Sequence, residues 1–176
     1  MQKSEYNGWF NYETWCANLW LTNDEGGCAW LEEQAQDCVQ DAIGADESDI
    51  RNAATYALAE RLEAYHDEMA EEWLPDQSSL FADFINAGLR EVNWHEIARH
   101  AVDEIALYSA GWNMPGYMPD NPPAVFLDAD DALEYVTEQI ESDEDCAHLD
   151  CTPLAADKNG EFGVHAGKYF YFVTRI

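Results

Sequence analysis

The sequence predicts an α-rich α+β protein, in which about five helices are followed by a small αβ unit with a short sheet. Hydrophobic residues make up 47% of the chain, with seven Trp, nine Tyr and seven Phe, so the chain can build a packed core. Apolar residues recur at helical spacing through the first hundred residues. The segment Lys168 to Ile176 is rich in aromatic and β-branched residues, which is typical of a strand.

Five helices are expected in the first part of the chain, at 11–22, 28–43, 47–74, 80–89 and 93–108. Asn11, Ser79 and Asn93 precede three of them as N-cap residues, and Glu96 completes a capping-box-like start after Asn93. The segment 23–27, Asn-Asp-Glu-Gly-Gly, is expected to separate the first two helices.

The stretch 111–123 contains four of the six prolines and two glycines. This composition predicts neither a helix nor a central strand, because proline lacks the N–H that both need. We therefore expect a linker at 111–123 between a helical acidic domain, 1–110, and an αβ unit, 124–176. Within that unit we expect strands at 124–127 and 168–176, a helix at 129–140, and a further strand candidate at 147–154.

Net charge is the outstanding feature of the composition: 36 acids face 8 bases, a formal charge of −28. No base occurs between Lys3 and Arg51 or between Arg99 and Lys158. A compact chain of this length is about 40 Å across, and duplex DNA carries one charge per ~1.7 Å of axis, so the two linear charge densities are comparable. Repulsion excludes nucleic acid as a direct partner, whereas a DNA-binding protein would be attracted.

The candidate binding residues are acids on helix faces. Glu60, Glu63, Asp67 and Glu71 recur every three or four residues and form one stripe along the third helix. Glu33, Asp37 and Asp41 form the outward face of the second helix. Trp9 and Phe10 are candidate aromatic anchors for a partner; the alternative is that the N-terminal aromatic cluster belongs to the core.

No residues suggest catalysis or a cofactor. The chain lacks a nucleophile motif and a phosphate-binding loop. His95 and His100 are five apart and point in different directions, so they fail the zinc-protease pattern and are expected to be ordinary exposed residues. Cys146, His148 and Cys151, with His165, are the only metal-ligand types close together, and without paired couples they predict no zinc site.

A reduced cytoplasm is the expected compartment. Five cysteines form no pattern, the N-terminus lacks a signal peptide, and no apolar stretch approaches the length that crosses a membrane.

The N-terminal segment Tyr-Asn-Gly-Trp-Phe-Asn-Tyr-Glu-Thr-Trp, residues 6–15, resembles a family of uncharacterised proteins encoded on phages and plasmids. The resemblance covers about the first hundred residues and implies a mobile-element setting, but no catalytic residues. The chain is also similar in charge and size to acidic antirestriction proteins, which mimic DNA.

These observations predict a non-enzymatic DNA mimic. Its partner would be a basic nucleic-acid-binding protein of the host, such as a restriction or CRISPR enzyme, whose cationic groove it would occupy. The alternative is a generic helical interaction module whose acidity reflects a high-salt cytoplasm. A homodimer is left open.

Overall fold

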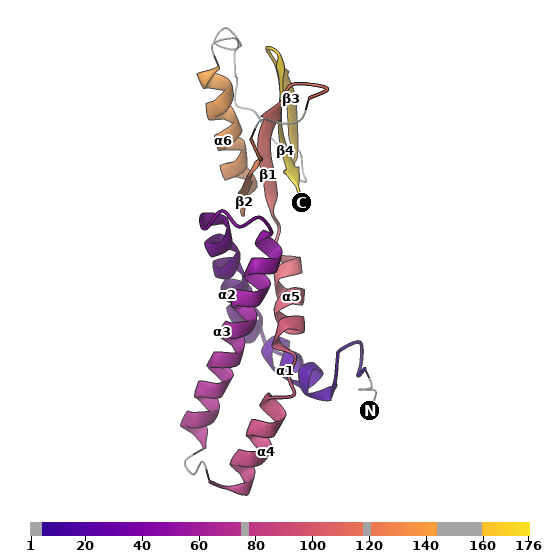
Figure 1. The fold of residues 1–176 in the computed structure, drawn as a ribbon, viewed down its shortest axis with the longest axis vertical. Helices are drawn as coiled ribbons and strands as arrows, with labels where there is room; N and C mark the ends of the chain where they lie inside the picture. The colour runs from indigo at the N-terminus through magenta and orange to yellow at the C-terminus, as the bar shows by residue number, and fades with distance from the viewer. Residues whose placement is uncertain (1–4, 75–77, 118–120, 144–159) are drawn as a thin grey trace. The chain divides into compact units, whose positions relative to one another are not determined.

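The computed structural model describes residues 5–74, 78–117, 121–143 and 160–176. The chain divides into two compact units, residues 1–105 and 106–176, whose elements are labelled in Figure 1. The described residues form six helices and one four-stranded antiparallel sheet. The predicted α-rich α+β class is confirmed.

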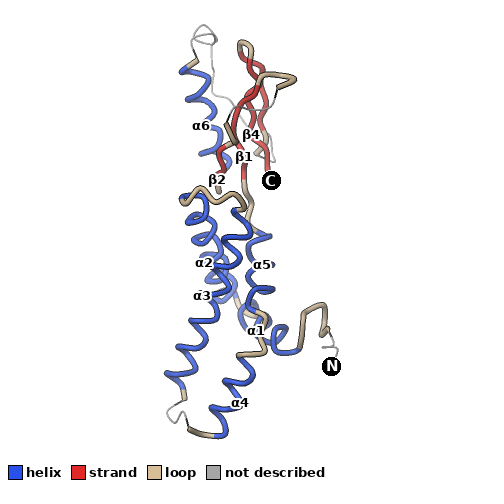
Figure 2. Tube along the Cα trace, viewed as in Figure 1, coloured by secondary structure: helices blue, strands red, loops and turns tan. Residues whose placement is uncertain are grey.

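Unit 1 is helical. Its elements are α1 (Tyr12–Thr22), α2 (Glu25–Gly44), α3 (Ile50–Trp73), α4 (Leu80–Leu89) and α5 (Trp94–Glu104), drawn in blue in Figure 2. Each follows a polar cap whose side chain accepts a hydrogen bond from a backbone N–H three residues on; the caps are Asn11, Asp24, Asp49, Ser79 and Asn93. The three predicted caps are confirmed, because this signal is local.

Helix α3 forms the centre of the unit 1 core, where it packs against α2, α4 and α5. Leu58 and Leu62 of α3 are completely buried, as are Val39 of α2 and Ile97 of α5. Arg51 at the start of α3 donates from its guanidinium to the carbonyl oxygens of Val102, at 2.7 Å, and Ile105, at 3.1 Å. Arg51 thus attaches the start of α3 to the end of α5, where the Val102 carbonyl also accepts from the Ile105 N–H at 3.1 Å.

Three predicted helix boundaries are wrong. Helix α2 begins at Glu25 rather than residue 28, because Asp24 caps it and glycine is accommodated in its first turn. A Cβ on Gly27 would lie 2.4 Å from the Leu21 carbonyl oxygen, so this close approach requires glycine. Helix α3 begins at Ile50 rather than residue 47, and α5 ends at Glu104 rather than residue 108.

Unit 2 is a sheet covered by one helix. Its elements are β1 (Tyr108–Asn113), β2 (Ala124–Phe126), α6 (Ala129–Ser142), β3 (Phe162–Ala166) and β4 (Tyr169–Arg175), and the strand order is β2-β1-β4-β3. Helix α6 buries Ala132, Val136 and Ile140 in the same cluster as Tyr171 and Val173 of β4. The Tyr171 hydroxyl donates to the Asp143 carboxylate at 2.9 Å.

Strand β1 corrects the predicted linker. Residues 111–113 lie in an interior strand, where Gly111 pairs with Phe172 and Trp112 with Tyr171 of β4. The first proline of the stretch, Pro115, comes after the end of this strand. Proline therefore does not prevent residues 111–113 from pairing in a sheet. Strand β3 was not expected, and the strand candidate at 147–154 lies outside the described residues.

Candidate acidic binding surface

The acidic stripe of α3 is built by helical spacing. Glu60, Glu63, Asp67 and Glu71 are all exposed, whereas Leu58 and Leu62 of the same helix are buried in the core. Neighbouring members of such a stripe lie about 5–6 Å apart between Cβ atoms. The four residues are called the α3 acidic stripe below.

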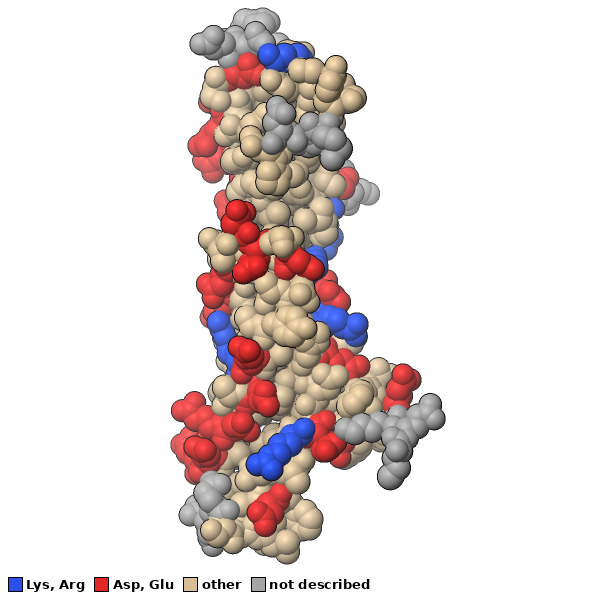
Figure 3. Space-filling model, in the orientation of Figure 1, with Lys and Arg blue, Asp and Glu red and all other residues tan. Residues whose placement is uncertain are grey.

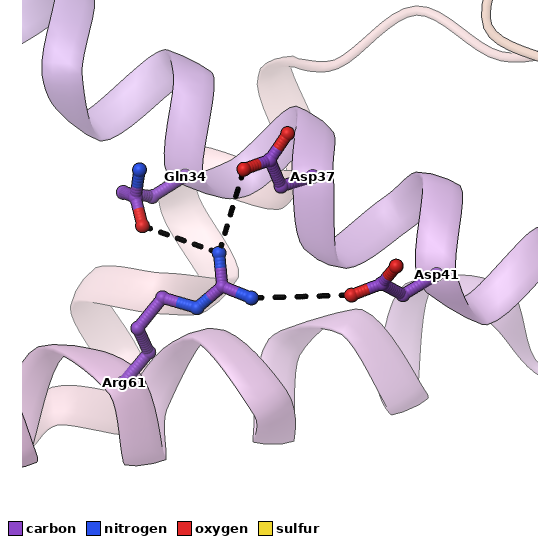
Figure 4. A network of polar contacts seen from close by, with 4 residues as sticks. All are labelled: Gln34, Asp37, Asp41 and Arg61. Atoms are coloured by element: carbon purple, nitrogen blue, oxygen red, sulfur yellow. Dashed lines mark hydrogen bonds and ion pairs between the residues drawn. The ribbon is translucent and has the colours of Figure 1, made fainter.

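Helix α2 adds three exposed acids, Glu33, Asp37 and Asp41, on the face opposite its buried residues. The Arg61 guanidinium of α3 lies 3.7 Å from Asp37 and 3.9 Å from Asp41, and it donates to the Gln34 side chain at 3.2 Å (Figure 4). Arg61 therefore joins the acids of α2 to the α3 helix and offsets part of their charge. Exposed pairs of this kind contribute little to stability.

Arg61 was missed as part of this surface. It is the only base between Arg51 and Arg90, which was the available signal, but its sequence position does not show that it reaches α2. Figure 3 shows one face of the molecule, on which acidic side chains outnumber basic ones and gather in several clusters with uncharged surface between them.

Trp9 and Phe10 lie against α5, so the structure does not bring these two residues together with the acids of α2 and α3. They follow a tight turn closed by a bridge between Tyr6 and Trp9, in which Asn7 and Gly8 have positive φ. The Trp9 ring lies 4.8 Å from that of His100, and the Phe10 N–H donates to Glu96 at 3.0 Å. Trp9 is half-buried and Phe10 is exposed.

The rest of the N-terminal motif has a structural role. Asn11 accepts hydrogen bonds from the N–H and hydroxyl of Thr14, and its amide donates to the Glu91 carbonyl at 2.6 Å. The Thr14 hydroxyl in turn accepts from the Asn93 N–H at 2.9 Å. Asn11 and Thr14 are both buried. This network attaches the start of α1 to the segment that begins α5.

His95 differs from its predicted exposure. The side chain is half-buried with its ring 4.8 Å from that of Tyr56, and its Nε2 atom is buried without a hydrogen-bond partner among the described residues. The prediction failed because it considered helix direction but not the packing of α3 on α5. His100 is exposed, as expected.

Metal-ligand residues give no cluster in the part of the chain that the structure describes: no three His, Cys, Asp or Glu side chains are placed to hold an ion. Cys146, His148 and Cys151 lie outside that part, and His165 lies on β3 with its ring beside Phe170. Burial raises the pKa of the Cys38 thiol, and the nearby Arg61 charge acts in the opposite direction. Cys38 is thus a packed thiol rather than a reactive one.

A cavity of about 830 Å³ lies in unit 2. Trp112, Tyr117, Tyr135 and Tyr169 line it together with amide and proline residues. Its described lining contains no carboxylate, histidine, cysteine or lysine, so it offers stacking surfaces but few groups for chemistry.

Unit 1 also carries a large apolar surface that was not expected from the sequence. Leu80, Phe81, Phe84 and Ile85 of α4 are exposed. The available signal was that the segment 80–89 is apolar around most of its circumference, which a single buried face does not require.

Among the described residues, no helix is both long and apolar enough to cross a membrane. A search of curated proteins found no match, and a search of solved structures found none either. A comparison with protein-family models matched residues 2–110, which include the N-terminal motif and all the helices of unit 1. The description of the matching family contains no phage, plasmid or antirestriction role. Because the match spans more than half of the chain, the chain belongs to this family, the family of unknown function DUF7249.

Proposed function

We propose that this protein is a DNA mimic that inhibits a host defence enzyme of the restriction or CRISPR type. Its partner is a basic nucleic-acid-binding protein, and its site of action is the host cytoplasm. The observation that carries the proposal is the α3 acidic stripe, four exposed acids in one row on a chain of net charge −28. The mobile-element setting rests on the resemblance of residues 6–15 to phage and plasmid proteins.

The spacing of the stripe supports phosphate mimicry. Carboxylates about 5–6 Å apart along a helix approach the spacing of phosphates along one DNA strand. A groove lined with Lys and Arg would meet these carboxylates as it meets phosphates, and the net charge would steer the two proteins together. The same charge repels nucleic acid, so the proposed ligand is a protein.

A protein that inhibits an enzyme by occupying its cationic groove does not need to catalyse a reaction. The acids of α2 and α3 lie on exposed helix faces, where a substrate would not be enclosed. We therefore propose a binding role without enzymatic activity, metal or cofactor.

A two-stage experiment tests the proposal. The immobilised protein is exposed to host lysate at about 0.05 M salt, and bound proteins are eluted either with duplex DNA or with about 0.5 M salt. We expect both treatments to release the same basic protein, because the two ligands compete for one cationic groove. Binding that survives both treatments would contradict phosphate mimicry.

The second stage locates the surface. In Glu63→Lys with Asp67→Lys, competition with DNA for the released protein should weaken by roughly tenfold or more, since charge pairs at such interfaces contribute about 1.5 kcal/mol or more. The matched control is Glu134→Lys with Glu138→Lys, an exposed pair at the same spacing on α6. Equal losses in both double variants would mean that net charge acts without a defined surface.

The alternative is an interaction module adapted to high salt, and the observation that favours it is the excess of 36 acids over 8 bases. Adaptation to a high-salt cytoplasm would produce the same composition. A halophilic protein should lose helical circular dichroism at physiological salt and regain it at molar salt, because self-repulsion is then screened. Retention of the fold at physiological salt would leave the mimic as the better explanation.

A further inference from the structure

Helix α4 is apolar around most of its circumference, yet Ala82 is its only fully buried residue. Leu80, Phe81, Phe84 and Ile85 are between 44% and 74% exposed. Two tryptophans of unit 1 are exposed to a similar degree, Trp20 near the end of α1 and Trp73 at the end of α3. Such large apolar side chains are normally covered in a stable protein.

Helices α1, α3 and α4 share one groove, which Trp20 and Ile85 help to line. An open groove of about 490 Å³ is lined by Trp20 of α1, by Met69 of α3, and by Ile85, Gly88 and Leu89 of α4, among others. Trp73 lies one helical turn beyond Met69, and Phe81 lies one turn before Ile85. Phe84 and Leu80 complete the exposed side of α4. The surface formed by Trp20, Trp73, Leu80, Phe81, Phe84 and Ile85 is called the α4 face.

We propose that the α4 face is the interface through which two copies of this chain form a symmetric dimer. The exposed area of the α4 face is large enough for a dimer interface. Aromatic side chains bury about 150–250 Å² each, so six large side chains at these exposures offer roughly 600–800 Å². A standard interface buries about 800 Å² per partner, whereas the largest apolar patch on a typical monomer is about 300–600 Å².

The distribution of charge also favours a second copy of the chain at this face. Two chains of net charge −28 repel each other over most of their surfaces. Residues 80–90 contain one acid, Asp83, and one base, Arg90, and the described lining of the groove contains one acid, Glu13. Only the end of α3 brings further acids close, because Glu71 and Glu72 precede Trp73. The α4 face is therefore less acidic than the rest of the chain, and like-charged copies can approach there. A basic partner would instead be drawn to the acids elsewhere on the chain.

Helix α4 can also pack against itself. Phe81 and Gly88 lie seven residues apart, on nearly the same side of the helix. If two α4 helices pack antiparallel about a two-fold axis between residues 84 and 85, Phe81 lies opposite Gly88 of the second copy, and Phe84 and Ile85 flank this contact. A Cβ placed on Gly88 has no atom within 4 Å, so there is open space where the opposing Phe81 ring would lie.

The mass of the full-length protein in solution tests the dimer. By light scattering at about 50 μM, well above a micromolar Kd, we expect twice the chain mass of 20.0 kDa. Phe81→Ser with Phe84→Ser removes apolar area without adding charge and should give the monomer mass. The control, Ile176→Ser, changes an exposed apolar side chain of unit 2 and should remain dimeric. A monomeric wild type, or a dimer unaffected by the double substitution, would overturn the proposal.

A second variant distinguishes loss of the dimer from loss of the fold, and it also tests the antiparallel arrangement. Gly88→Leu adds a helix-favouring residue in open space, so the melting temperature of the monomer should stay constant or rise. The same side chain would collide with Phe81 of the second copy, and the dimer Kd should increase at least tenfold. An unchanged dimer Kd in this variant would overturn the antiparallel arrangement.

A basic helical partner is distinguished with a Lys-rich amphipathic peptide as probe. Tight binding of the peptide to a monomeric wild type, lost in Phe81→Ser with Phe84→Ser, would assign the face to such a partner instead. The proposed dimer does not depend on the proposed DNA mimicry. Salt should change dimer affinity and competition with DNA in opposite directions. Screening should tighten the dimer and weaken competition with DNA, so either can fail alone.

Discussion

Unit 1 presents two surfaces that differ in almost every physical respect. The α3 acidic stripe is charged and exposed, and the field of such charges reaches about a Debye length, ~8 Å at physiological salt. The α4 face is largely apolar, and apolar surface stabilises a complex only where it is removed from water. At 100° per residue, Glu63 and Asp67 point to the side of α3 roughly opposite Met69, which lines the groove. A single helix thus carries acids on one side and part of the apolar groove on the other.

The largest expected effect is a loss of stability that disturbs both surfaces, because α3 contributes residues to each. Leu62→Ala should lower the free energy of unfolding by about 2–5 kcal/mol, because Leu62 is completely buried between helices and its loss leaves a cavity. Chemical denaturation measures this, with Leu19→Ala, at an exposed position of α1, as the matched control. Wild-type stability in the Leu62 variant would show that α3 does not anchor the two surfaces.

A smaller loss of stability should affect the α4 face and leave the α3 acidic stripe nearly unchanged. Asn11→Ala removes the cap of α1 and its bond to the Glu91 carbonyl, and should cost about 1–3 kcal/mol. Helix α1 supplies Trp20 to the groove, so the dimer should weaken while competition through the α3 acidic stripe is nearly unchanged. Asn52→Ala, at an exposed position of α3, is the control. Equal weakening of both activities would mean that the surfaces are coupled through α1.

The smallest expected effect is on the charge of the α2 acids that Arg61 contacts. Arg61→Met removes the cation beside Asp37 and Asp41, and because the pairs are exposed, stability should change by less than about 1 kcal/mol. Competition with DNA should strengthen by a factor of about two to five, since two carboxylates lose their neighbouring charge. Arg99→Met makes the same charge change on α5. Weaker competition in the Arg61 variant would indicate that Arg61 positions these acids for binding.

The helices could be predicted because their signals are local. The caps Asn11, Ser79 and Asn93 bond to N–H groups three residues away, and the alternation of buried Leu58 and Leu62 with exposed acids follows one helix. Strand β1 could not be predicted in the same way. Its interior position depends on pairing with β4, about sixty residues later, and no local pattern indicates that pairing.

The candidate site was predictable only in part. Helical spacing correctly placed Glu33, Asp37 and Asp41 on the exposed face of the second helix. Spacing does not reveal that Arg61 reaches across to α2, which depends on how two helices pack. It also does not reveal that α4 leaves its phenylalanines exposed, because an apolar helix has the same composition whether or not another surface covers it.

The bonds between the N-terminal motif and the segment before α5 have a consequence during synthesis of the chain. Asn11 and Thr14 find their partners at Glu91 and Asn93, about eighty residues later. At translation rates of about 5–20 residues per second, these partners are made roughly 4–16 s after the motif. Helix α1 also contacts α2, which is translated directly after it, so it does not wait for all of its partners. Only its attachment to the segment before α5 is delayed by this interval, and until then the cap of α1 is not held against the rest of unit 1.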